Sequence, residues 1–113
     1  MSETVAEYSV AVAKAMPEKE LMQNVLDMAR SLGYWCYHTF DSRRSSPGFP
    51  DIIAVKGKRL LALECKRHGK DLTEAQVSWL MKLQDAGFIC RTIRPDDWLD
   101  GSVERLLRRE DAA

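Results

Sequence analysis

Two carboxylates and an amine are spaced along the middle of the chain in a way that suits phosphodiester hydrolysis. Asp51 opens one apolar run, and Glu64 and Lys66 close a second. A short turn containing Gly57 joins the two runs and indicates a hairpin. Pairing across this turn brings Asp51 beside Glu64, and strand alternation points Glu64 and Lys66 to one face. We therefore expect the three side chains to converge.

The chemistry of such a cluster depends on a cation. Two neighbouring carboxylates repel each other unless a positive charge lies between them. Hard oxygen ligands beside an ammonium group suit Mg²⁺ or Mn²⁺ and a phosphate, because the ion polarises the phosphoryl group and acidifies a bound water. Lys66 would orient the attacking water or help to deprotonate it. The expected cofactor is thus Mg²⁺ or Mn²⁺.

The elements that must position this cluster follow from hydrophobic periodicity and turn residues. Apolar residues at helical spacing predict three helices, two of which flank the cluster in sequence, and β-prone runs predict four strands. The expected order is a helix from Pro17 to Gly33, a strand at 34–40, the hairpin at 51–66, a helix at 73–86, a strand at 88–93 and a closing helix at 95–109 with Gly101 as a possible break. This order predicts an α/β fold with a small mixed sheet between helices.

The residues around the cluster resemble a known nuclease superfamily. Pro50-Asp51 followed by Glu64-Cys65-Lys66 is similar to the PD-(D/E)xK pattern. The order of elements resembles that of the VRR-NUC branch of this superfamily. Three further patterns resemble it as well: Glu18-x-x-Leu before a helix that ends in Gly, Gly48-Phe49-Pro50-Asp51, and Thr73-x-x-Gln76. The resemblance covers about residues 17–94 and implies a restriction-endonuclease-like αβββαβ core.

The resemblance also implies roles for individual residues. Asp51, Glu64 and the backbone carbonyl of Cys65 would bind the metal ion, and Lys66 would be catalytic. Gln76 would lie near this lysine and hold a water or phosphate, although an ordinary exposed helix glutamine is the alternative.

Glu18 has support from its own position as well as from the resemblance. It precedes Leu21 by three residues and therefore lies on the inward stripe of its helix, whereas Glu20 lies on the wet face. The resemblance implies that Glu18 assists the metal ion directly or through water. A favourable interaction of an acid with the helix dipole is the alternative.

The net charge of the chain is zero, and a net charge of zero by itself argues against a nucleic-acid partner. The charges are, however, distributed unevenly along the chain. Residues 43–70 hold eight basic and only two acidic side chains, and the two acids are Asp51 and Glu64. This pattern fits a polyanion site that contains a metal, and solvation of the 56–59 turn and of the 41–48 loop is the alternative. The candidate DNA-binding residues are Arg43, Arg44, Arg67 and Lys70.

Length and composition indicate one domain. We expect residues 1–16 to form an arm or short helix and residues 17–113 to form the nuclease-like domain. Because there is neither an apolar run of membrane-spanning length nor an evident signal peptide, we expect a cytoplasmic protein. Three cysteines, none in a CxxC pair, predict buried reduced thiols at Cys36, Cys65 and Cys90.

Three functions remain open at this point. The resemblance favours an endonuclease similar to Holliday-junction resolvases, acting as a homodimer on branched DNA. A repair or restriction-type nuclease acting on flaps or linear duplex would keep the same residues. A catalytically silent DNA-binding module would keep the basic centre but has no need of the acid pair.

Overall fold

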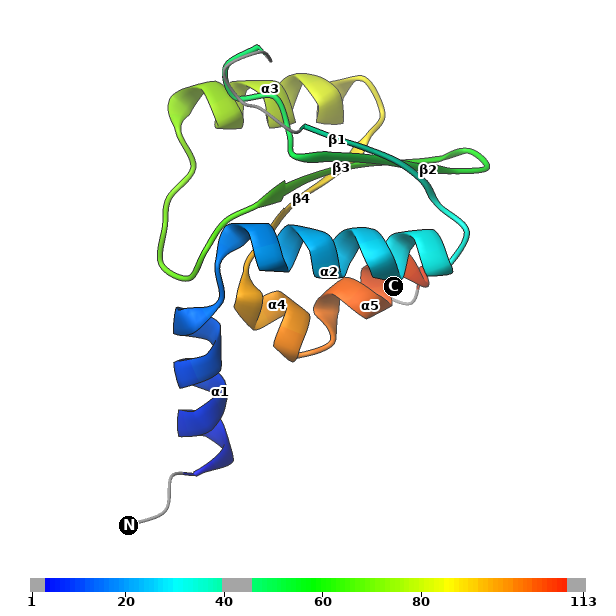
Figure 1. The fold of residues 1–113 in the computed structure, drawn as a ribbon. Helices are drawn as coiled ribbons and strands as arrows, with labels where there is room; N and C mark the ends of the chain where they lie inside the picture. The colour runs from blue at the N-terminus through cyan, green and yellow to red at the C-terminus, as the bar shows by residue number, and fades with distance from the viewer. Residues whose placement is uncertain (1–3, 40–45, 110–113) are drawn as a thin grey trace.

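A computed structural model describes residues 4–39 and 46–109 of the chain. The elements follow the order α1 (Val5–Ala15), α2 (Glu18–Ser31), β1 (Trp35–His38), β2 (Ile52–Lys56), β3 (Arg59–Cys65), α3 (Glu74–Asp85), β4 (Ile89–Ile93), α4 (Pro95–Leu99) and α5 (Ser102–Leu107) (Figure 1). From α2 to β4 this is the expected αβββαβ order, so the predicted fold class is confirmed.

The four strands form one mixed sheet in the order β1-β2-β3-β4. β2 pairs antiparallel with both β1 and β3, and β3 pairs parallel with β4. Gly57 has a φ of 60° in the tight turn between β2 and β3, a conformation that glycine adopts without steric cost. The parallel pair needs a crossover, and α3 supplies it.

The hydrophobic core lies on one face of the sheet, against α2, α4 and α5 (Figure 1). Alternate strand residues point into this core and are fully buried; they include Ile52, Ala54, Leu61 and Leu63. They pack with the inward stripe of α2, which includes Leu21, Val25 and Leu26. Helix α3 lies on the other face, and none of its residues is buried. The two faces are therefore covered to very different extents.

The expected closing helix is two short helices. Gly101, with a φ of 85°, separates α4 from α5 at the predicted break. The hydroxyl of Tyr34 donates to the carbonyl of Leu107 at 2.9 Å, and the Arg59 guanidinium donates to the carbonyl of Leu106 at 2.6 Å. The first bond satisfies a carbonyl that the end of α5 leaves unpaired, and both bonds hold α5 against the core.

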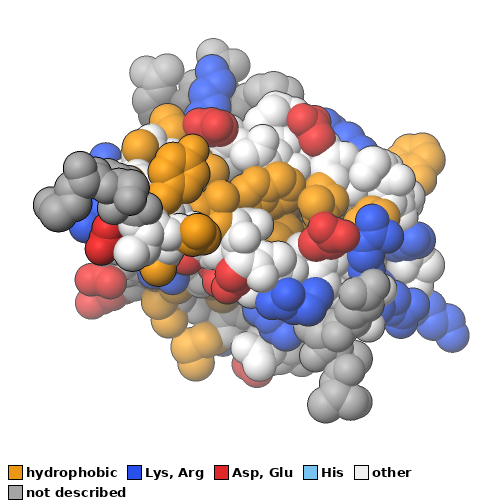
Figure 2. All heavy atoms as spheres, turned by 90° about the horizontal axis from the view of Figure 1, so that it is seen from below, with side chains coloured by type: hydrophobic (Ala, Val, Ile, Leu, Met, Phe, Trp, Pro, Cys, Tyr) orange, Lys and Arg blue, Asp and Glu red, His pale blue; other side chains and the backbone are white. Residues whose placement is uncertain are grey.

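Helix α1 projects from the body of the protein and packs mainly on α4 (Figure 1). It exposes Val5, Tyr8 and Val10. When the molecule is seen from below the view of Figure 1, apolar side chains form a central band that is bordered by charged side chains (Figure 2). Among the described residues, no helix has the length and apolarity needed to cross a membrane.

The three cysteines are free thiols, as expected. Only Cys65 is buried, however, because Cys36 and Cys90 lie at partly covered positions of the sheet. Burial raises the pKa of each of these thiols above its ordinary value. The prediction of buried thiols is thus right for Cys65 and wrong for the other two.

Candidate active site

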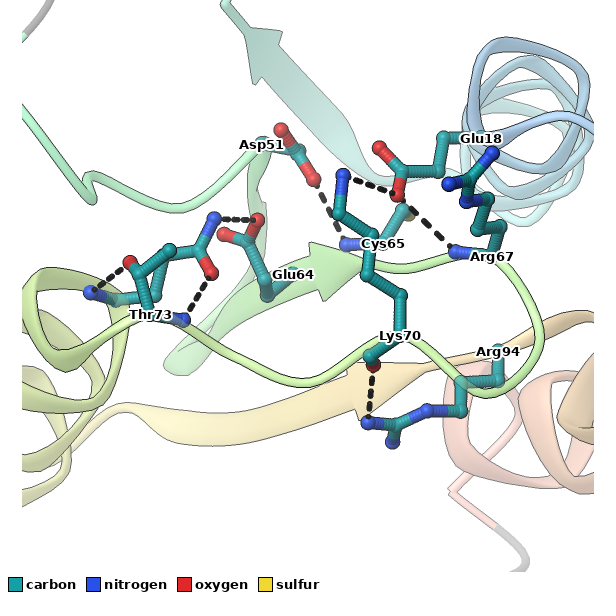
Figure 3. Close-up of polar contacts among 9 residues, drawn as sticks. Glu18, Asp51, Glu64, Cys65, Arg67, Lys70, Thr73 and Arg94 are labelled. Carbon is teal, nitrogen blue, oxygen red and sulfur yellow. Dashed lines mark hydrogen bonds and ion pairs between the residues drawn. The ribbon is translucent and has the colours of Figure 1, made fainter.

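The hairpin places Asp51 and Glu64 opposite each other. Ile52 pairs with Leu63 across the hairpin. Asp51, which precedes Ile52, and Glu64, which follows Leu63, are therefore cross-strand neighbours. The Cys65 backbone N–H donates to Asp51 Oδ2 at 2.8 Å and fixes the orientation of this carboxyl group (Figure 3). The predicted convergence of the two acids is therefore present in the fold.

The environment of Glu64 is unusual for a carboxylate. Its side chain is only 3% exposed, and its Oε2 atom is buried without a hydrogen-bond partner. Leaving such an oxygen unsatisfied is costly, and this oxygen is of the kind that could coordinate a cation. Burial, with a further contribution from the neighbouring Asp51, raises the pKa of Glu64 to about 8.

Asp51 and Lys66 share this environment. Burial raises the pKa of Asp51, while the hydrogen bond from Cys65 opposes the rise. Lys66 is 4% exposed, and its charge lowers the pKa of both carboxyl groups by less than burial raises them. When both carboxyl groups are ionised, one ammonium does not balance them, whereas a divalent cation between them would. The donor set, two carboxylates with one free buried oxygen, fits Mg²⁺ or Mn²⁺.

Gln76 contacts the acid pair directly. Its Nε2 donates to Glu64 Oε1 at 3.0 Å (Figure 3). Its Oε1 accepts from the Thr73 N–H at 2.8 Å, and its own N–H donates to Thr73 Oγ1 at 3.2 Å, which is a capping box. The start of α3 thus holds the amide against Glu64, a contact that differs from the expected water or phosphate.

Glu18 lies beside the pair but is already engaged. Its Oε1 accepts from the Arg67 N–H at 3.2 Å and lies 3.6 Å from Lys70 Nζ (Figure 3). Its charge also contributes to the raised pKa of Asp51, whereas Glu20 is exposed on the other side of the helix. In the part of the chain that the structure describes, no group of three or more His, Cys, Asp or Glu side chains is arranged to hold a metal ion. Glu18 therefore does not complete a three-carboxylate site.

The order of elements and the site geometry agree with the comparison to known families. The VRR-NUC domain model matches residues 4–95 of this 113-residue chain. The chain belongs to the VRR-NUC family. No curated protein and no solved structure matches it. The family match begins at residue 4 and thus includes α1, so it reaches beyond the 17–94 span that the motifs indicated.

VRR-NUC domains are nucleases, and DNA is the substrate that this membership implies.

The loop that precedes Asp51 in this VRR-NUC domain is held against α3. Gly48 has a φ of 83°, and a Cβ atom at this position would lie 2.4 Å from the Ala75 carbonyl carbon. Phe49 and Trp79 stack edge to face with ring centroids 5.0 Å apart. The glycine in the Gly48–Asp51 motif is therefore explained by close approach, since no side chain fits there.

The four predicted DNA-binding residues fall into two groups. Arg43 and Arg44 lie outside the described residues. The Arg67 side chain is exposed, and Lys70 forms the ion pair with Glu18 while its carbonyl accepts from Arg94 Nη2 at 3.0 Å (Figure 3). The loop between β3 and α3 is thus tied to α2 on one side and to the start of α4 on the other.

Sequence reasoning missed the residues that fix this loop. Arg94 holds Lys70, and His68 Nδ1 lies 3.0 Å from Asp96 Oδ1 at the start of α4, a contact that lowers the pKa of Asp96. Both links depend on how α4 packs below the sheet. No local motif marks them.

Proposed function

We propose that this chain is a Mg²⁺- or Mn²⁺-dependent endonuclease that hydrolyses phosphodiester bonds in branched DNA. The observation that carries the proposal is the pair of facing carboxyl groups, a half-buried Asp51 and a buried Glu64, with an unsatisfied oxygen on Glu64 and a buried lysine beside it. A module that only binds DNA has no need of this arrangement, and burying it costs stability.

The proposed ligands of the metal ion are Asp51, Glu64 and the backbone carbonyl of Cys65. When bound, the ion would polarise the phosphoryl group and acidify a water. Gln76 holds Glu64 in place, and Glu18 assists through water. The engagement of Glu18 by Arg67 and Lys70 favours this indirect role over direct coordination.

Lys66 acts on the reacting atoms. Its ammonium group orients the attacking water and stabilises the negative charge that develops on the phosphate. Because the side chain is buried, this interaction is stronger than it would be in water. Arg67 and Lys70 contact backbone phosphates, as do Arg43 and Arg44.

Within this proposal the substrate is a four-way junction and the active form is a homodimer, since two symmetric cuts require two active sites. Both statements depend on the resemblance to junction resolvases. Flap or linear duplex DNA is the competing substrate, because cleavage of either would use the same residues.

A cleavage assay on matched junction, flap and duplex substrates tests the proposal. We expect cleavage in Mg²⁺ or Mn²⁺, none in excess chelator, and none by Asp51→Ala or Glu64→Ala. Glu20→Gln, an exposed change on α2, is the control and should cut like the original chain. Equal cutting of duplex and junction, or an active monomer in light scattering, would reject the resolvase version and leave the metal-dependent nuclease standing.

A further inference from the structure

Two aromatic side chains on β1 are unusually exposed for a strand of a small domain. Trp35 is 85% exposed and Tyr37 is 63% exposed. An exposed single apolar residue is ordinary, but two large aromatic residues on one face of an edge strand form a stacking surface. The fold gives no reason for their exposure, since neither contributes to the core.

Strand register places both rings on the face that carries the candidate active site. Tyr37 pairs with Ile53 and Trp35 pairs with Val55. One row further on, the Thr39 N–H donates to the Asp51 carbonyl at 3.1 Å, so Asp51 lies in the next same-face row. Same-face rows are about 6.6–6.8 Å apart along a strand. Tyr37 is therefore one row from the carboxylates and Trp35 is two rows away.

Among the described residues, this part of the face is open. Helix α3 packs mainly on β3 and β4 and leaves β1 uncovered on this side (Figure 1). In the rows of Tyr37 and Trp35, the β2 residues Ile53 and Val55 are only partly buried. Tyr37 and Trp35 therefore form an exposed aromatic row along the edge strand β1, and this row begins next to the acid pair.

The sheet edge beside Trp35 is basic. Lys58, which is exposed, lies at the turn that follows Val55. Arg30 lines a shallow hollow of about 320 Å³ at this edge together with Trp35, and Lys56 donates to the Leu32 carbonyl at 2.6 Å; both lie on the α2 side of the sheet. The cores of protein interfaces are depleted of charge, whereas single-stranded nucleic acid binds where aromatic rings alternate with cations. The surroundings therefore favour a nucleic-acid strand over a second protein chain.

We infer that unpaired DNA bases stack on Trp35 and Tyr37, and that the backbone of this strand leads from there to Asp51 and Glu64. The inference rests on the proposed nuclease function for the cut, but the binding itself does not require cleavage. Within branched DNA it favours a substrate with unpaired bases within a few nucleotides of the scissile phosphate, such as a flap, over a fully paired four-way junction. Stacking on a ring tolerates any base, so no sequence preference is expected from this surface.

The test is a binding titration in excess chelator, where no cutting occurs. A labelled oligothymidine strand and a blunt duplex are each titrated with the full chain. Trp35→Ala and Tyr37→Ala should each weaken oligothymidine binding by about 10-fold or more and duplex binding much less, because stacking is lost. Trp35→Phe should restore most of the affinity. Tyr8→Ala is a matched control, since Tyr8 is also 63% exposed but lies on α1.

Unchanged oligothymidine affinity in both alanine variants would overturn the inference. So would an equal loss for strand and duplex. Sedimentation of the same variants identifies the competing explanation: if Trp35→Ala converts a dimer into a monomer, the row is a contact between two copies. Failure of the proposed function is a separate result, because it would appear as absent metal-dependent cleavage by the unmodified chain, whatever the binding titration gives.

Discussion

The two faces of the sheet are built for different purposes. The face toward α2 is packed with aliphatic residues such as Ile52, Leu61 and Leu63, which are fully buried and contain no polar side-chain atom. The face toward α3 holds a buried, incompletely paired Glu64 and an exposed Trp35 on the same sheet. One face follows the rules of stable packing, and the other departs from them twice.

This difference between the two faces indicates which face carries the proposed function. Departures from good packing lower stability, and they are expected where a binding or catalytic site needs them. Both departures lie on the face that carries Asp51, and the packed face compensates for their cost. Changes on the two faces should therefore separate stability from activity.

The largest expected effect is on catalysis. Lys66→Met keeps the volume of the buried side chain but removes its charge, so we expect cleavage to fall by about 10³-fold or more while the protein stays folded. Single-turnover cleavage and a thermal melt measure the two properties. The control is Lys82→Met, an exposed change on α3. A folded Lys66→Met protein that cuts within a few-fold of the original rate would remove the lysine from the mechanism.

The next effect is on stability alone. Leu63→Ala leaves a cavity in the packed face, and we expect a loss of about 2–5 kcal/mol in the free energy of unfolding. Val55→Ala, at a partly exposed position of the other face, should cost clearly less. Urea denaturation measures both. Equal costs would show that the two faces contribute alike to stability.

The pH dependence of stability separates the faces further. The pKa of Glu64 is raised from 4.5 to about 8 in the folded protein, so the folded state holds a proton that the unfolded chain has released. This contribution is fully present below pH 4.5, falls as the pH rises and is lost above about pH 8. We therefore expect the melting temperature of the metal-free protein to fall between these pH values.

Glu64→Gln should flatten this pH dependence, since the amide does not titrate. Saturating Mg²⁺ should oppose the fall at the upper end, because the ion would take the place of the proton. A metal-free protein whose melting temperature rises over this range would mean that Glu64 is not buried as described.

The smallest expected effect concerns the contact between α3 and the acid pair. Gln76→Ala removes the hydrogen bond to Glu64 Oε1, and we expect the cleavage rate at subsaturating metal to fall by about 10-fold. Gln84→Ala, an exposed glutamine on the same helix, is the control. If saturating metal restores the rate of Gln76→Ala, the glutamine positions a ligand. If the loss persists at every metal concentration, the amide acts on the substrate instead.

The acid pair on the α3 face was predictable because its geometry is local. Gly57 indicated a tight hairpin, and strand alternation then placed Asp51 opposite Glu64 without any tertiary information. The burial pattern of the packed face was equally accessible from the inward stripe of α2.

The remaining features depend on packing between distant elements. The bond from Gln76 to Glu64 exists because α3 docks across β3, and the ion pair of Glu18 with Lys70 exists because the loop after β3 meets α2. Trp35 looked like an ordinary strand residue, since a sequence does not tell which strand lies at an edge or which part of a face a helix leaves open.

Calorimetric titration with Mn²⁺ tests the central claim most directly, namely that Asp51 and Glu64 form a metal-binding pair. We predict saturable binding by the unmodified chain and by Glu20→Gln, and loss of that binding in both Asp51→Asn and Glu64→Gln, with melts showing that each variant is folded. If either of these two variants binds Mn²⁺ as tightly as the unmodified chain, the carboxylates are not the ligands and the account is wrong.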